Sequence, residues 1–99
     1  MVKEIKESEF AQSISTGKVV VDCYAPWCGP CRMLSPVMDE LSEELTDYTF
    51  YKLNVDDAEE VSRKYGIMSI PALLILENGE LKQKLVGFKS KAELKEILK

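Results

Sequence analysis

The sequence predicts an α/β fold in which a central mixed sheet of five strands is flanked by four helices. Two observations support it. Segments with helical apolar spacing alternate with short β-rich segments, and this alternation favours parallel strands joined by right-handed crossovers. The dipeptide Asn78-Gly79 between two apolar segments indicates a hairpin, which adds an antiparallel pair. The chain has 99 residues, and we expect residues 1–99 to form a single domain.

The chain begins with a weak predicted strand over residues 2–5. Ser8 is expected to cap a short helix that buries Phe10 and Ile14, because residues four apart share a helix face. Gly17 is expected to end this helix, since glycine readily adopts the left-handed conformation of a helix end. The sequence therefore predicts a strand followed by one short helix.

A buried strand and the longest helix are predicted next. Residues 18–24 contain a continuous apolar run, which indicates a strand covered on both faces in the middle of a parallel sheet. After the Cys-Gly-Pro-Cys turn, apolar residues recur at helical spacing at Met33, Leu34, Val37, Met38, Leu41 and Leu45. Another β-rich strand is predicted over residues 49–55.

Turn and capping signals divide the rest of the chain. Asp57 and Glu60 form a capping-box pair for a helix that runs through Tyr65 and ends at Gly66. Strands over residues 72–76 and 81–86 form the hairpin. A second capping box, Ser90 with Glu93, opens the last predicted helix.

Composition argues against several classes of partner. The chain has 13 basic and 17 acidic residues and no basic cluster that could neutralise a nucleic-acid backbone. Its apolar runs are far shorter than the roughly 20 residues that cross a bilayer. The first ten residues are rich in charge and lack the apolar stretch of a secretion signal. We therefore expect a cytoplasmic protein with no nucleic-acid or membrane partner.

Two of the three cysteines, Cys28 and Cys31, are separated by only two residues. A disulfide that closes so small a loop constrains the unfolded chain little, which favours redox exchange over a structural role. The pair follows a predicted strand and opens a predicted helix, whose N–H groups and dipole favour a thiolate at Cys28. The sequence therefore predicts that Cys28 attacks a disulfide and Cys31 resolves the mixed disulfide.

Zinc binding is the main alternative use of paired cysteines. A structural zinc site takes four ligands, whereas this chain has no histidine and only Cys23 to add to the pair. Such a site would require two copies of the chain. We therefore predict no metal.

Asp22 lies in the apolar strand, where an unpaired carboxylate is costly. Burial is expected to raise its pKa and leave it partly protonated near neutrality, which suits a proton shuttle. The alternative is a charge at the strand end that reaches solvent.

Several motifs together carry a family resemblance. They are, in order, Val21-Asp22-Cys23-Tyr24-Ala25-Pro26, Trp27-Cys28-Gly29-Pro30-Cys31, Lys52-Leu53-Asn54-Val55-Asp56, Tyr65-Gly66-Ile67-Met68-Ser69-Ile70-Pro71, Asn78-Gly79-Glu80 and Val86-Gly87. With these motifs the sequence resembles the thioredoxin family across essentially the whole chain. The resemblance implies the thioredoxin fold and a general protein-disulfide reductase that carries electrons by dithiol–disulfide exchange.

The resemblance also implies roles for residues around the cysteines. Asp22, linked to Lys52 directly or through water, would help to deprotonate Cys31. Pro71 would follow a cis peptide bond, face the cysteines and present the backbone of Ile70 to an extended substrate chain. Gly66 and Ala25 would lie nearby. The implied substrate-binding residues are Trp27, Gly29, Pro30, Ile70, Pro71 and Gly87.

The implied partners are disulfide-containing proteins and an NADPH-dependent thioredoxin reductase that recharges the cysteine pair. The resemblance implies no cofactor bound to this chain, and we expect a monomer. An oxidase or isomerase of the same fold, or a redox-independent binding subunit, is the alternative. A histidine between the cysteines would make the disulfide more oxidising. The uncharged Gly29 and Pro30 found there favour the reductase.

The sequence departs from the family pattern at two adjacent positions. Cys23 stands where the family commonly has an aromatic residue, and Tyr24 where it commonly has tryptophan. On a buried strand, a lone cysteine is expected to behave as a small inert apolar residue. The alternative is a regulatory thiol.

Overall fold

The five strands of the sheet lie in the order β1-β3-β2-β4-β5 in a computed structural model that describes residues 1–99. Strands β1, β3 and β2 are parallel, and the hairpin strands β4 and β5 complete the sheet with antiparallel pairings. The predicted mixed sheet is therefore confirmed. The strands are β1 (Val2–Glu4), β2 (Lys18–Tyr24), β3 (Tyr48–Asn54), β4 (Ala72–Glu77) and β5 (Glu80–Val86).

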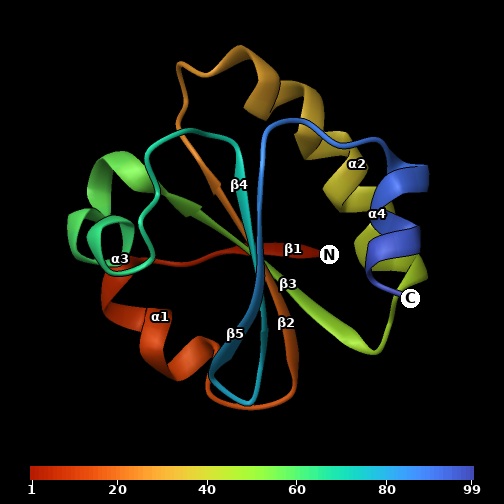
Figure 1. The fold of residues 1–99 in the computed structure, drawn as a ribbon, viewed down its shortest axis with the longest axis horizontal. Coiled ribbons are helices and arrows are strands. Elements are labelled where there is room, and N and C mark those ends of the chain that lie inside the picture. Colours follow the sequence, from red (N-terminus) through yellow and green to blue (C-terminus); the bar gives the residue numbers. More distant parts are fainter.

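Four α-helices cover the two faces of the sheet, as Figure 1 shows. They are α1 (Glu7–Ser13), α2 (Gly29–Glu44), α3 (Glu59–Lys64) and α4 (Lys91–Ile97), and a short 3-10 helix, η1 (Val55–Asp57), precedes α3. Helices α1 and α3 lie on one side, and α2 and α4 lie together on the other (Figure 1). None of these helices has the length and apolar character needed to cross a bilayer.

Strand β2 separates two apolar cores. Val19 and Val21 point into the core beneath α1 and α3, which also holds Phe10. Val20 points into the core beneath α2 and α4, with Leu34. Alternate residues of a strand face opposite sides of the sheet, so both faces of this central strand are buried, as its apolar run predicts.

The predicted start and end of the first helix are wrong. Helix α1 begins at Glu7 instead of after Ser8, and the carboxylate of Glu9 accepts a hydrogen bond of 2.8 Å from the backbone N–H of Lys6. The N-cap position is therefore Lys6, and Ser8 lies inside the first turn of the helix. Gly17 lies beyond the helix, and its N–H donates to Asn78 Oδ1 at 2.8 Å.

The predicted capping box of the third helix is also wrong. Asp57 belongs to η1, where Asn54 Oδ1 accepts a 3.0 Å hydrogen bond from the Asp56 N–H. Helix α3 receives its side-chain partner from α1, because Glu7 Oε2 accepts a 2.8 Å hydrogen bond from the Val61 N–H. A contact across 54 residues replaces the local one that the sequence pattern predicts.

The hairpin and the last capping box are confirmed. Asn78 and Gly79 have φ angles of 50° and 84°, the positive values that a two-residue turn of type I′ requires at both positions. Ser90 Oγ accepts a 3.1 Å bond from the Glu93 N–H, and Glu93 Oε1 accepts a 3.0 Å bond from the Ser90 N–H. These short-range patterns determine their local structure unaided.

Candidate active site

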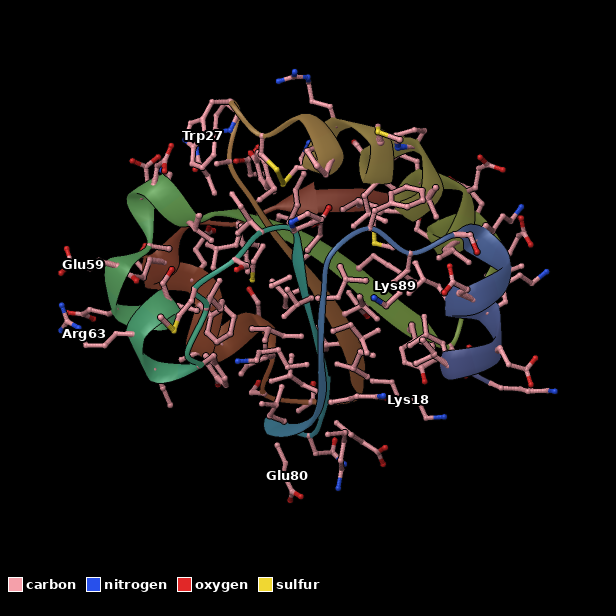
Figure 2. All side chains as sticks on the ribbon, turned by 45° about the horizontal axis from the view of Figure 1, so that its top comes forward. Lys18, Trp27, Glu59, Arg63, Glu80 and Lys89 are labelled. Carbon is pink, nitrogen blue, oxygen red and sulfur yellow. A yellow bond between two sulfur atoms is a disulfide. The ribbon has the colours of Figure 1, made fainter.

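The two paired cysteines lie where β2 leads into α2. Cys28 caps the helix and is joined to Cys31 by a disulfide, with 5.3 Å between their Cα atoms. The backbone N–H of Cys31 donates to Cys28 Sγ at 3.2 Å, so the first turn of the helix directs a donor at the first sulfur, as predicted. Both cysteines are largely buried. Figure 2 shows the disulfide as a yellow bond close to Trp27.

Trp27 lies on the surface beside the disulfide, with 68% of its area exposed. Its indole Nε1 donates to Asp56 Oδ2 at 3.0 Å, which ties this side chain to η1. Sequence reasoning did not identify Asp56 as part of the site, because the two residues are 29 positions apart and no local pattern joins them.

The loop before β4 approaches the disulfide from the other side. The peptide bond between Ile70 and Pro71 is cis, as the resemblance implies, and the Ile70 carbonyl oxygen lies 3.9 Å from Cys28 Sγ. Pro71 is buried, and its carbonyl accepts a 2.8 Å hydrogen bond from the Gly87 N–H. The structure therefore brings Ile70 close to Cys28 and joins Gly87 to the neighbouring Pro71, although these segments are far apart in the chain.

Asp22 is the only charged residue that the fold buries, with 4% of its area exposed. Burial raises the pKa of its carboxyl to about 7, against the attraction of the Lys52 ammonium, which lowers it. Lys52 is its register partner on β3, yet the two charged groups form no direct ion pair within 4 Å, and Asp22 Oδ1 has no hydrogen-bond partner. The prediction of a buried carboxylate is confirmed, and the alternative of a solvent-exposed strand end is wrong.

A pocket of about 270 Å³ joins Asp22 to the second cysteine. Its lining comes from the end of β2, the start of α2 and one residue of β3, namely Asp22, Tyr24, Ala25, Pro26, Cys31, Arg32, Ser35 and Lys52. This volume has room for water between the carboxyl and Cys31. The pocket therefore offers a route for a proton from the thiol of Cys31 to the carboxyl of Asp22.

Tyr24 links this pocket to the edge strand β1. Its hydroxyl donates to Glu4 Oε2, and the Lys52 ammonium lies 5.7 Å from the centre of its ring. Burial and the bond to Glu4 both raise the pKa of the Tyr24 hydroxyl, which therefore stays a donor. Glu4 is a second residue that sequence reasoning did not place here.

Cys23 has no exposed surface and lies between Leu53 and Ala72 in the register of the sheet. Burial, and secondarily the neighbouring Asp22 carboxylate, raise the pKa of its thiol to about 12. A thiol attacks a disulfide only as its thiolate, so Cys23 is unreactive at neutral pH. This supports the expected inert role.

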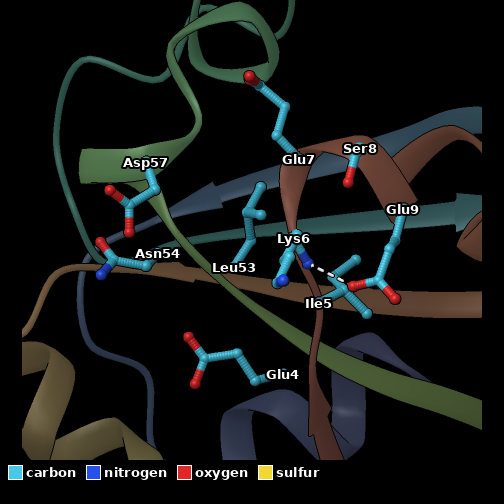
Figure 3. A pocket seen from close by; sticks show the side chains of 9 residues that line it. All are labelled: Glu4, Ile5, Lys6, Glu7, Ser8, Glu9, Leu53, Asn54 and Asp57. Atoms are coloured by element: carbon cyan, nitrogen blue, oxygen red, sulfur yellow. Dashed lines mark hydrogen bonds between the residues drawn. The ribbon is translucent and has the colours of Figure 1, made fainter.

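The largest hollow of the surface, about 570 Å³, lies away from the cysteines (Figure 3). Three of its four carboxylates already have structural partners, because Glu9 accepts from the Lys6 N–H, Glu7 from the Val61 N–H and Glu4 from the Tyr24 hydroxyl. No group of acidic side chains here or elsewhere is arranged to hold a metal ion. The site is therefore the cysteine pair and its surroundings.

Comparison with known proteins places the chain among relatives that match it from end to end. The family model described as Thioredoxin matches residues 1–99. A thioredoxin of Mycoplasmoides gallisepticum is 47% identical over 94 residues, which cover 94% of each chain. A thioredoxin of Bacillus subtilis is 45% identical over 93% of this chain and 89% of its own, and one of Listeria monocytogenes is 43% identical over 99% and 96%.

Proposed function

Since this chain belongs to the thioredoxin family, it is a thiol–disulfide oxidoreductase that reduces protein disulfides, and we propose that Cys28 attacks the substrate and Cys31 resolves the mixed disulfide. The observation that carries this assignment is the 3.2 Å bond from the Cys31 N–H to Cys28 Sγ. A donor at the start of a helix stabilises negative charge on the sulfur that accepts from it. Cys28 is therefore the sulfur that ionises first.

The exchange proceeds in two steps that balance in atoms and electrons. The Cys28 thiolate attacks one sulfur of the substrate disulfide, so that a mixed disulfide forms and the other substrate sulfur leaves as a thiolate. The thiolate of Cys31 then attacks Cys28 Sγ, which closes the disulfide seen in the structure and releases the second substrate thiolate. Two electrons pass from the cysteine pair to the substrate.

We assign Asp22 the role of proton acceptor for Cys31 in the second step. A base with a pKa near the working pH is the most effective one, and the raised pKa of about 7 meets this requirement. The pocket shared by the Asp22 carboxyl and Cys31 supports transfer through water, since both residues line it. Lys52 lines the same pocket and limits how far the pKa of Asp22 rises.

Asp22→Asn is expected to slow the second step by about a hundredfold near pH 7, the lower end of what a positioned base contributes. This loss of rate shrinks well above pH 8, where thiols of ordinary pKa ionise without a base. It also shrinks below about pH 6, where Asp22 of the natural chain is itself protonated. The measurement is the release of reduced substrate from a preformed mixed disulfide, followed from pH 5 to 10. If the release rate of the variant had the same pH profile as that of the natural chain, Asp22 would have only a structural role.

Unfolding of the same variant provides the control for correct folding. The folded-state pKa of about 7 exceeds the ordinary value of 3.8, so Asp22 stabilises the natural chain fully below pH 4 and loses this contribution as the pH rises through 7. Asparagine does not titrate. The variant should therefore gain stability relative to the natural chain between pH 4 and 8, on the order of 4 kcal/mol in urea unfolding.

We propose that protein substrates bind as an extended segment along Ile70, next to the disulfide. Ile70 lies outside the strands, and its N–H and carbonyl have no backbone hydrogen-bond partner, so both can pair with a substrate chain. The remaining proposed contacts are Trp27, Gly29, Pro30, Pro71 and Gly87. Trp27 supplies the largest exposed apolar surface among them.

We further propose a cytoplasmic monomer that an NADPH-dependent thioredoxin reductase recharges. The net charge of −4 and the absence of a charge between Cys28 and Cys31 support a soluble reductant over an oxidant. Recharging requires a donor of two electrons, because each turnover leaves the Cys28–Cys31 disulfide.

The equilibrium of the cysteine pair with glutathione tests the reductase against the oxidase. We expect a reduction potential close to about −270 mV, the reference value for thioredoxins, because neither Gly29 nor Pro30 between the cysteines carries a charge that would stabilise the dithiol form further. The ratio of reduced to oxidised protein over a series of glutathione mixtures gives the value. A potential near about −120 mV would identify an oxidant.

A further inference from the structure

The loop that carries Ile70 is bonded at one end by Lys84 of β5 and at the other by Gly87, the residue that follows β5. At the far end, the Gly87 N–H donates to the Pro71 carbonyl at 2.8 Å. At the near end, Lys84 Nζ donates to the Tyr65 carbonyl at 3.1 Å and to the Gly66 carbonyl at 3.0 Å. We call residues 66–70 the docking loop. It is held between Lys84 of β5 and Gly87.

The end of α3 explains why a cation is needed at the near end. The last carbonyls of a helix have no partner within it, and the positive φ of Gly66, +63°, turns the chain away. The Ile67 N–H donates to the Ser62 carbonyl at 2.8 Å. The carbonyls of Tyr65 and Gly66 accept instead from Lys84 Nζ. A lysine here also complements the negative end of the helix dipole.

The middle of the docking loop makes few contacts of its own. Met68 has 95% of its area exposed, Ser69 is exposed, and neither makes a backbone hydrogen bond. A loop with few internal hydrogen bonds takes its position from its ends. Ile70 packs against the cluster that holds Cys28, and the backbone on either side of it is positioned by the bonds from Lys84 and Gly87.

We propose that Lys84 is a positioning residue for protein substrates, which fixes the docking loop so that Ile70 presents its backbone to an extended chain. This inference rests on the proposed binding of substrate at Ile70. Lys84 bonds to carbonyls of Tyr65 and Gly66 and has no contact with either sulfur of the disulfide. It acts on the affinity for a protein chain and leaves the reactivity of Cys28 unchanged.

Two substrates separate these effects in single turnovers of the pre-reduced protein. Insulin offers a protein chain, whereas 2-hydroxyethyl disulfide is small, uncharged and has no backbone to pair. Lys84→Met keeps the length of the side chain and removes its donor, and Lys84→Arg restores a donor. Lys82→Met removes the same charge from the same strand, where Lys82 pairs only with Glu80.

Lys84→Met is expected to lower the second-order rate constant with insulin about fivefold, the factor for the net loss of roughly one hydrogen bond. The rate with 2-hydroxyethyl disulfide should stay unchanged. Lys84→Arg should recover most of the insulin rate, and Lys82→Met should match the natural chain with both substrates. Thermal unfolding of each variant shows that the comparison is made on folded protein.

Two results would overturn the proposal. An unchanged insulin rate in Lys84→Met would show that the docking loop keeps its place without Lys84. An equal fall with both substrates would show that Lys84 acts on the sulfur chemistry. Failure of the proposed function looks different, since the natural chain itself would then reduce 2-hydroxyethyl disulfide and leave insulin untouched, and both inferences would be lost.

Discussion

Cys28→Ser is expected to abolish the reduction of insulin disulfides, with a fall of more than about a thousandfold, because the variant has no nucleophile for the first step. Cys28 is the only sulfur that accepts an N–H from the first turn of α2, and a serine hydroxyl in its place does not attack a disulfide at neutral pH. The measurement is the precipitation of the free insulin B chain, with dithiothreitol as the electron donor and its uncatalysed rate subtracted.

The remaining thiols make this a stringent test. The N–H of the first helical turn is directed at Cys28 and not at Cys31, and burial raises the pKa of Cys23 to about 12. Circular dichroism should show an unchanged fold, since the substitution exchanges one small side chain for another. Turnover at even a tenth of the natural rate would mean that another group attacks and that the assignment of Cys28 is wrong.

Cys31→Ser has the second large expected effect, which is to trap a covalent complex with the substrate. Cys28 keeps its helix-terminal N–H donor and still forms the mixed disulfide, but no second thiol is within reach to release it. Intact mass spectrometry of the pre-reduced variant mixed with an equal amount of disulfide substrate should show one substrate thiol per protein chain. Steady-state turnover should fall by about a hundredfold or more.

The double variant Cys28→Ser/Cys31→Ser is the matched control and should form no such complex. It retains Cys23, so a complex in the control would mean that the buried thiol reacts. Normal turnover of Cys31→Ser would contradict the resolving role, because an external thiol would then suffice to release the product.

The features that the sequence predicts well are those that depend on short stretches of chain. The turn at Asn78-Gly79, the capping box of Ser90 and Glu93, and the apolar run of β2 each constrain the backbone over a few residues. The cysteine pair belongs to the same class, since its place at a strand end and helix start follows from the flanking segments. Such local signals do not depend on contacts with distant parts of the chain.

The features that the sequence did not reveal depend on distant partners. Asp57 lies in a 3-10 turn instead of the expected capping box. The Val61 N–H of α3 donates instead to Glu7, which lies 54 positions away. The hydrogen bonds from Trp27 to Asp56 and from Lys84 to the end of α3 form only when the sheet brings these elements together. Hydrogen bonds of this kind have no period or spacing that a reader of the sequence could recognise.

The site lies between these extremes. An aspartate within a continuous apolar run predicts a buried carboxyl, and the structure confirms this for Asp22. The distance to Lys52 could not be predicted, because the register of β2 and β3 places the residues side by side without joining their charged ends. Both residues line the pocket that also reaches Cys31 at the start of α2.

The position of Trp27 has a practical consequence for spectroscopy. It is the only tryptophan of the chain, and it precedes the attacking sulfur by one residue. Indole emission excited at the red edge of the absorption band therefore originates from a single point at the site. Any change in intensity or wavelength on reduction, docking or unfolding can be attributed to that point without subtracting a second emitter.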